Sequence, residues 1–135
     1  MQKQDIKIRS VEGKDFDCYV VTPDGAGKAP AVVLASAIHG VDADLRAIAD
    51  EFAAKGFIAA APDLFWRTVP GPLPRGDDRL TKRGQPRLPV IKSGENDMTD
   101  TLNQLKKMPQ FNGKAIAMGF CFGGPYAVIA PRRLG

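Results

Sequence analysis

One stretch near the end of the chain constrains the fold most strongly: a glycine-rich turn between two apolar runs. The turn has the pattern Gly-x-Cys-x-Gly-Gly and extends from Gly119 to Gly124. The apolar run before it, residues 115–118, has the length and bulk of a buried strand, and the run after it has helical character. This order predicts a nucleophile elbow, a sharp strand-to-helix turn that holds a reactive side chain at its apex.

Cys121 stands at the apex of the predicted elbow, between Gly119 and Gly123. Such a strained turn needs neighbours that are nearly free of side chains, and glycine meets that need. At the N-terminus of the following helix, the helix dipole and unpaired N–H groups favour the thiolate over the thiol. The pattern alone leaves two alternatives, a small buried cysteine and a phosphate-binding turn. The known phosphate and dinucleotide fingerprints do not match, so we expect no cofactor.

Length and composition predict one small domain of an ordinary globular protein. The chain has 135 residues, of which 44% are hydrophobic and 25% charged, enough for a single core. The N-terminus has no apolar signal-peptide core and no apolar run has the length of a membrane span. Two cysteines, Cys18 and Cys121, make no disulfide framework, which favours a reducing cytoplasm. With His39 as the single histidine, we expect no metal site.

The excess of positive charge is concentrated between Arg67 and Lys92. The formal net charge of the chain is +4, and Arg67 and Arg79 are among the cations of this stretch. The stretch lacks interleaved aromatic residues and a helical recognition face, so we do not expect nucleic-acid binding. A solvated loop and a loop that attracts an anionic small substrate remain the alternatives.

Apolar patterning along the rest of the chain predicts a mostly parallel α/β sheet in three layers. Strands are expected at residues 5–9, 16–21, 31–36, 57–61 and 115–118, and helices at residues 42–55 and 95–108. The first two strands form an antiparallel hairpin, with Cys18 in the core. The strand–helix–strand unit over residues 31–61 is a right-handed βαβ unit. Residues 62–92 are expected to form a long functional loop, because ligands bind where parallel strands end.

This order of elements resembles the α/β-hydrolase fold, and within it the dienelactone hydrolase family (carboxymethylenebutenolidase-like proteins). The resemblance covers nearly the whole chain. It is carried by residues 112–124, which contain Gly-Phe-Cys-Phe-Gly-Gly, by residues 31–41, and by residues 56–65, which contain Gly-Phe and Pro-Asp-Leu-Phe.

The resemblance implies a small-molecule ester or lactone hydrolase that works through an acyl-cysteine. Cys121 matches the family's nucleophile. Phe122 and Ile38 would supply the two backbone N–H groups of the oxyanion hole. Substrate contact is expected from His39, Arg67 and Arg79.

Two features depart from the family pattern. Where family members commonly carry a glutamate before the first oxyanion residue, this chain has Ala37. His39 either compensates for that loss or only lines the loop. In this fold the acid and the histidine of the triad follow the nucleophile, and neither occurs between Pro125 and Gly135. We therefore expect residues 1–135 to be a single partial domain, the N-terminal part of a longer protein, apparently truncated after the nucleophile elbow.

Three functions follow as alternatives: a cysteine-dependent hydrolase, a non-catalytic fragment or pseudoenzyme, and a small anion-binding module that uses the Arg67–Lys92 stretch. A truncated sheet would also expose the edge of the elbow strand, through which we expect self-association.

Overall fold

The computed structural model describes residues 1–25, 27–83 and 87–120. Their elements are β1 (Gln2–Arg9), β2 (Asp15–Thr22), β3 (Ala29–Ala35), α1 (Ala43–Ala54), β4 (Ile58–Pro62), α2 (Arg79–Arg83), α3 (Arg87–Lys106) and β5 (Phe111–Gly119). The five strands form one sheet in the order β1-β2-β4-β3-β5.

The described sheet is mixed rather than mostly parallel. β3 runs parallel to β4 on one side and to β5 on the other, whereas β2 runs antiparallel to both β1 and β4. The antiparallel half arises because the predicted opening hairpin joins the sheet through its second strand. The predicted βαβ unit is present as β3, α1 and β4, and it contributes the parallel centre of the sheet.

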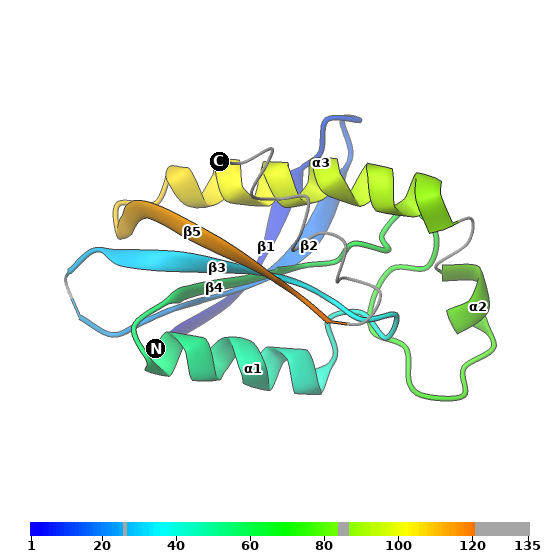
Figure 1. Ribbon diagram of the computed structural model, residues 1–135, viewed down its shortest axis with the longest axis horizontal. Coiled ribbons are helices and arrows are strands. Elements are labelled where there is room, and N and C mark those ends of the chain that lie inside the picture. Colours follow the sequence, from blue (N-terminus) through cyan, green and yellow to red (C-terminus); the bar gives the residue numbers. More distant parts are fainter. Residues whose placement is uncertain (26, 84–86, 121–135) are drawn as a thin grey trace.

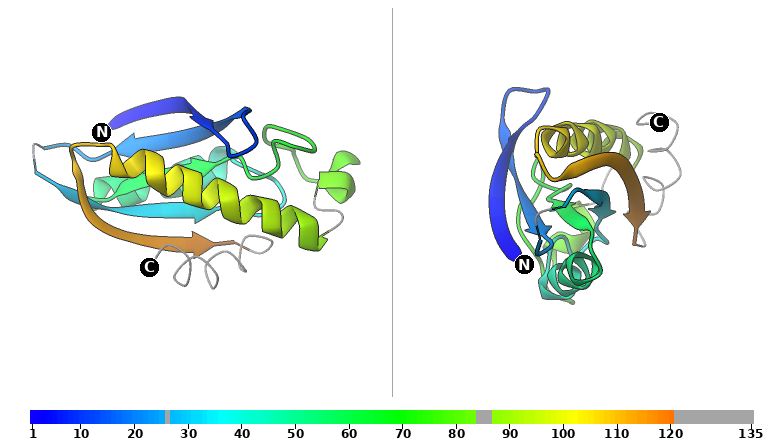
Figure 2. Two further views of the ribbon diagram at one scale, coloured as in Figure 1. Left: turned by 90° about the horizontal axis from the view of Figure 1, so that it is seen from above. Right: turned by 90° about the vertical axis from the view of Figure 1, so that its left-hand side faces the viewer.

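Two helices cover the opposite faces of the sheet and give the predicted three layers. In Figure 1, α3 lies above the strands and α1 lies below them, and the end-on view of Figure 2 separates the layers. Side chains alternate along β3, so that Val32 and Leu34 pack on the α1 side, while Val33 and Ala35 pack on the α3 side. A strand that is buried on both faces needs apolar residues at successive positions, which explains the continuous apolar run in the sequence.

The ends of α1 follow the predicted capping chemistry. Asp42 is the N-cap residue, and its Oδ1 accepts a hydrogen bond of 3.0 Å from the Leu45 N–H. This bond satisfies one of the N–H groups that the first turn of a helix leaves unpaired. Gly56 follows the helix with a φ of +97°, a left-handed conformation that glycine adopts without steric cost. The predicted helix over residues 42–55 is therefore confirmed within one residue at each end.

The predicted long loop and the helix after it need correction. α3 begins at Arg87 instead of residue 95, which shortens the loop, and α2 is a short helix that the loop can contain. Ser93, whose hydroxyl would suit an N-cap just before residue 95, lies inside α3. Pro89 marked this stretch as a loop, but it stands in the first turn of α3, where a helix requires no N–H donor. The predicted buried stripe of Met98, Leu102 and Leu105 is confirmed.

β5 is longer than predicted and lies at one edge of the described sheet. It begins at Phe111, which pairs with Ala29 of β3, and an irregularity in register separates this pair from the regular pairing that starts at Ala115. Among the described strands, only β3 is its neighbour. Ile116, in the middle of β5, is 51% exposed, which is unusual for a large aliphatic residue in a strand.

Candidate active site

The candidate site begins at the tight turn that follows β3. The turn comprises residues 37–40 and is closed by a hydrogen bond of 3.0 Å from the Gly40 N–H to the Ala37 carbonyl. Gly40 has a φ of +79°, which explains the glycine at this position. Ile38, the predicted oxyanion residue, is the first of the two central residues, and its side chain packs against the core on the α3 side.

Every carbonyl of residues 37–39 accepts a hydrogen bond. The donors are the Gly40 N–H for Ala37, Arg83 Nη1 for Ile38 at 3.0 Å, and the Leu73 N–H for His39 at 3.0 Å. The Ile38 N–H, by contrast, has no acceptor within the described residues. An N–H that stays unpaired in a turn with all carbonyls satisfied is available to an external oxygen atom.

The end of β5 lies beside this turn. Gly119 pairs with Ala35, the last residue of β3, and the Phe120 N–H donates to the Ala35 carbonyl at 3.1 Å. The chain therefore enters the predicted elbow next to the strand that leads into the Ile38 turn. Four residues of the predicted elbow lie outside the described residues, namely Cys121, Phe122, Gly123 and Gly124.

His39 faces the connecting segment between β4 and α2. Its Nδ1 lies 3.2 Å from the Leu73 carbonyl oxygen. With that leucine it lines a pocket of about 400 Å³, whose further lining residues are Asp42, Asp44, Pro72, Pro74 and Arg75. His39 thus contributes both to the shape of the connecting segment and to a cavity beside the Ile38 turn.

Arg67 is held by carboxylates of the chain itself. Its guanidinium forms a two-pronged contact with Asp97, at 2.8 and 2.9 Å, and a further bond of 2.6 Å to Glu12. The Trp66 Nε1–H also donates to Asp97, at 3.1 Å. Asp97 is fully buried, and burial raises the pKa of its carboxyl, an effect that Arg67 opposes. The described contacts place Arg67 in a structural network between α3 and the segment after β4.

Arg79 also has its charge matched locally. Its Nη2 lies 2.9 Å from Asp77, and hydrogen bonds from Arg79 hold the pKa of the Asp77 carboxyl at about 2. In contrast, the Arg75 guanidinium forms no ion pair within the part of the chain that the structure describes. Of these three arginines, Arg75 is therefore the one that forms no ion pair among the described residues, although Asp42 and Asp44 line the same pocket.

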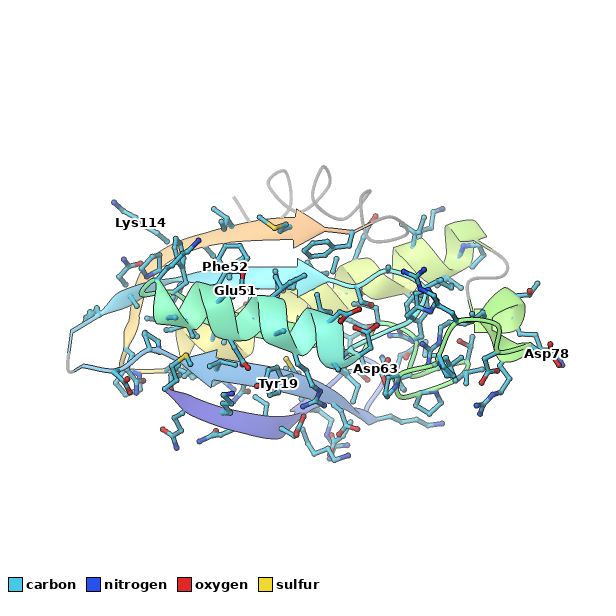
Figure 3. All side chains as sticks on the ribbon, turned by 90° about the horizontal axis from the view of Figure 1, so that it is seen from below. Tyr19, Glu51, Phe52, Asp63, Asp78 and Lys114 are labelled. Atoms are coloured by element: carbon cyan, nitrogen blue, oxygen red, sulfur yellow. The ribbon has the colours of Figure 1, made fainter. Side chains whose placement is uncertain are left out.

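Two buried ionic residues that we did not single out from the sequence complete the site. Asp63 follows β4 directly, at the carboxyl end of the parallel strands (Figure 3). Its carboxylate accepts hydrogen bonds from the Phe65 N–H at 3.2 Å and the Gly71 N–H at 2.8 Å. Arg83 ends α2 with a side chain that is 0% exposed. The i, i+3 spacing from Leu80 to Arg83 was the available signal, since it places both on one side of α2.

The other sequence prediction about a reactive group that the structure tests concerns Cys18. Cys18 is buried in the core as predicted, and burial raises the pKa of its thiol. Among the described residues, no group of three or more His, Cys, Asp or Glu side chains is placed to hold a metal ion. None of the described helices combines the length and the apolar character that a membrane span requires.

Comparison with known sequences gives one consistent family. Residues 16–134 match the Dienelactone hydrolase family. A carboxymethylenebutenolidase of Pseudomonas putida is 30% identical over 132 residues, which cover 96% of this chain and 56% of that protein. Carboxymethylenebutenolidase 1 of Cupriavidus pinatubonensis is 28% identical over 140 residues, with 99% and 58% covered. The chain thus spans somewhat more than half the length of these two relatives.

Comparison with solved structures confirms the fold. The structure of m3DLH superposes with a TM-score of 0.81 at 24% identity, covering 99% of this chain and 55% of that one. A dienelactone hydrolase-like promiscuous phosphotriesterase from metagenomic libraries superposes with a TM-score of 0.73 at 20% identity, covering 98% and 55%. The predicted α/β-hydrolase-like architecture is therefore correct.

Proposed function

Because the chain belongs to the dienelactone hydrolase family, we propose that its protein hydrolyses a small-molecule ester or lactone with Cys121 as the nucleophile. The observation that carries this proposal is the Ile38 turn, whose Ile38 N–H has no acceptor among the described residues and lies beside the strand that leads into the predicted elbow. That arrangement suits stabilisation of an oxyanion at a carbonyl under attack.

The proposed reaction has two steps. The Cys121 thiolate attacks the carbonyl carbon, and the Ile38 and Phe122 N–H groups stabilise the negative charge on the carbonyl oxygen. The carbon–oxygen bond to the alcohol portion then breaks, and the departing alkoxide takes up a proton. Water attacks the resulting thioester, which releases the carboxylic acid and regenerates the thiol.

Activation of Cys121 has to work without a carboxylate at position 37. We assign it to the N-terminus of the helix expected after the elbow, where unpaired N–H groups favour a thiolate. The His39 Nδ1 lies beside the Leu73 carbonyl instead, which supports a role in shaping the pocket wall.

An anionic substrate would be attracted through Arg75 rather than through Arg67 or Arg79. Arg75 lines the pocket beside His39, while the other two arginines are paired with carboxylates. We expect Arg75→Glu to lower kcat/KM for a carboxylate-bearing lactone much more than for a neutral ester, because only the former has a charge to attract. Equal losses on both substrates would argue against this attraction.

The central experiment compares Cys121→Ala with Cys18→Ala in the intact protein, using a chromogenic acetate ester and a lactone. Cys18 is a buried core residue, so its replacement is the matched control for loss of one thiol. We expect Cys121→Ala to lower kcat by about a thousandfold or more, whereas Cys18→Ala retains turnover. Mass spectrometry after rapid quenching should find the acyl group on Cys121. Equal turnover in the two variants would refute the nucleophile and favour a non-catalytic role.

A further inference from the structure

We propose that Arg83 is a positioning residue: its buried guanidinium holds the Ile38 turn so that the Ile38 N–H points toward the reacting carbonyl. The catalytic part of this inference rests on the function proposed above, whereas the structural part does not.

Arg83 binds backbone carbonyl groups from two separate segments. Nη1 donates to the Ile38 carbonyl at 3.0 Å, and Nη2 donates to the carbonyls of Val69, at 2.5 Å, and Gly71. Its guanidinium carbon lies 5.1 Å from the centre of the Phe65 ring. The planar fork of arginine can satisfy several carbonyls at once, so one side chain ties the turn after β3 to the segment after β4.

Gly71 is held from both sides of its backbone. Its N–H donates to the Asp63 carboxylate at 2.8 Å, and its carbonyl accepts from Arg83. Asp63 is itself fixed at the end of β4, and its N–H donates to the Asp17 carbonyl at 2.9 Å. The segment that anchors Arg83 is therefore bonded to the sheet. Through its bond to the Ile38 carbonyl, Arg83 restricts the motion of the Ile38 turn as well.

The direction of the Ile38 N–H follows from the geometry of the turn. In a planar trans peptide, the carbonyl and the N–H point in opposite directions. The Ala37 carbonyl points at the Gly40 N–H, so the Ile38 N–H points away from the interior of the turn. The Arg83 bond to the Ile38 carbonyl fixes the next peptide plane, which leaves the turn little freedom to rotate.

Burial argues against substrate contact as the role of Arg83. Its side chain is 0% exposed, and its three acceptors are all backbone carbonyls. No ion pair involves Arg83 within the described ranges, although Asp63 is near enough to favour its charge. A buried cation without a paired carboxylate is costly, which makes a purely space-filling role a poor explanation.

Gly40 offers a test that leaves the arginine itself intact. A Cβ at this position would lie 2.8 Å from Arg83 Nη1 and 3.1 Å from the Gly71 carbonyl oxygen. Gly76 is the matched control, because its φ of +82° nearly equals the +79° of Gly40 and a Cβ there would meet no atom within 4 Å. The two alanine variants thus share the backbone strain and differ in the contact with Arg83.

We expect Gly40→Ala to lower kcat by about tenfold to a hundredfold on a chromogenic acetate ester, with KM changed less than about twofold. Gly76→Ala should retain the kcat of the wild type. Both variants should lose thermal stability through the shared backbone strain, and Gly40→Ala should lose more because its Cβ also contacts Arg83 and Gly71. Arg83→Met should reproduce the loss in kcat while the Cys121 alkylation rate stays unchanged. The inference would be overturned if Gly40→Ala kept the wild-type kcat. It would also be overturned if Gly76→Ala and Gly40→Ala lost the same share of kcat.

Hydrogen exchange separates this inference from the proposed function. In Arg83→Met, amide exchange should accelerate in peptides that contain residues 36–41 and 68–74, but not in those from α1. An inactive wild type with this exchange pattern would refute the hydrolase and leave the structural part of the inference standing. Unchanged exchange in both peptides would refute the role of Arg83, whatever the activity of the wild type.

Discussion

Asp63 and Asp77 are two carboxylates of the same connecting segment, and their surroundings move their pKa values in opposite directions. Burial raises the pKa of Asp63 above its ordinary 3.8, while hydrogen bonds from Arg79 lower that of Asp77 to about 2. A pKa that differs between the folded and unfolded chain makes stability depend on pH. The contributions of Asp63 and Asp77 to the free energy of unfolding should therefore change with pH in opposite directions.

We expect this difference in equilibrium unfolding of the wild type, Asp63→Asn and Asp77→Asn. As the pH rises above 3.8, the unfolded chain loses the Asp63 proton first, so the wild type loses stability relative to Asp63→Asn. Between about pH 2 and 3.8, the folded chain loses the Asp77 proton first, so the wild type gains stability relative to Asp77→Asn. Denaturant titrations at several pH values measure both trends, and two trends of the same sign would contradict the assignment.

The two cysteines should differ in reactivity at the scale of single residues as well. Cys18 is fully buried and burial raises its thiol pKa, so it should be inert near neutral pH. Cys121, at the predicted elbow, should react much faster with iodoacetamide because a helix N-terminus favours the thiolate. Peptide mapping after timed labelling compares the two sites within one sample. Faster labelling of Cys18 would refute the elbow.

At the scale of elements, α3 is joined to the segment after β4 by the buried contact between Arg67 and Asp97. The Arg67 side chain is 20% exposed and that of Asp97 is 0% exposed. Removing one partner of such a pair leaves the other charge buried and unmatched, which is far costlier than losing an exposed ion pair.

We expect Arg67→Met to lower the free energy of unfolding by about 3–5 kcal/mol. The double variant Arg67→Met/Asp97→Leu should recover much of this loss, because no charge then remains buried. Arg46→Met is the control, since its pair with Asp5 is exposed on both sides and should contribute at most ~1 kcal/mol. Urea denaturation of the four proteins tests the expectation. Equal losses in Arg46→Met and Arg67→Met would mean that burial of Asp97 does not matter.

Elements with a strong apolar pattern were predictable from the sequence, and those fixed by distant contacts were not. The continuous run of β3 and the helix at residues 42–55 were predicted correctly because their causes are local. The start of α3 was missed because Pro89 breaks helices everywhere except in the first turn. The Ile38 turn followed from the family resemblance, whereas the bond from Arg83 to it joins residues far apart in the chain, which no local pattern encodes.

At the scale of the whole molecule, β5 forms one open edge of the described sheet. Ile116 is 51% exposed there, and among the described strands β5 pairs only with β3. An open strand edge with an exposed apolar residue is a template for pairing with another chain.

We expect residues 1–135, produced on their own, to self-associate in a concentration-dependent way. Ile116→Lys should shift the protein toward the monomer, because a charged edge residue opposes strand pairing. Val11→Lys is the control, since Val11 is 66% exposed in the turn after β1. Size-exclusion chromatography with light scattering measures the mass of each species. A wild type that stays monomeric at all concentrations would contradict the prediction.

The strand order has a consequence for synthesis on the ribosome. β3 lies between β4 and β5 in space but precedes both in the chain. One edge of this apolar strand therefore stays unpaired until Phe111–Gly119 has been translated. At ordinary elongation rates this delay lasts on the order of ten seconds. The nascent chain thus carries an aliphatic strand with one open edge while residues 36–119 are made, and we expect a ribosome-associated chaperone to bind β3 during this interval.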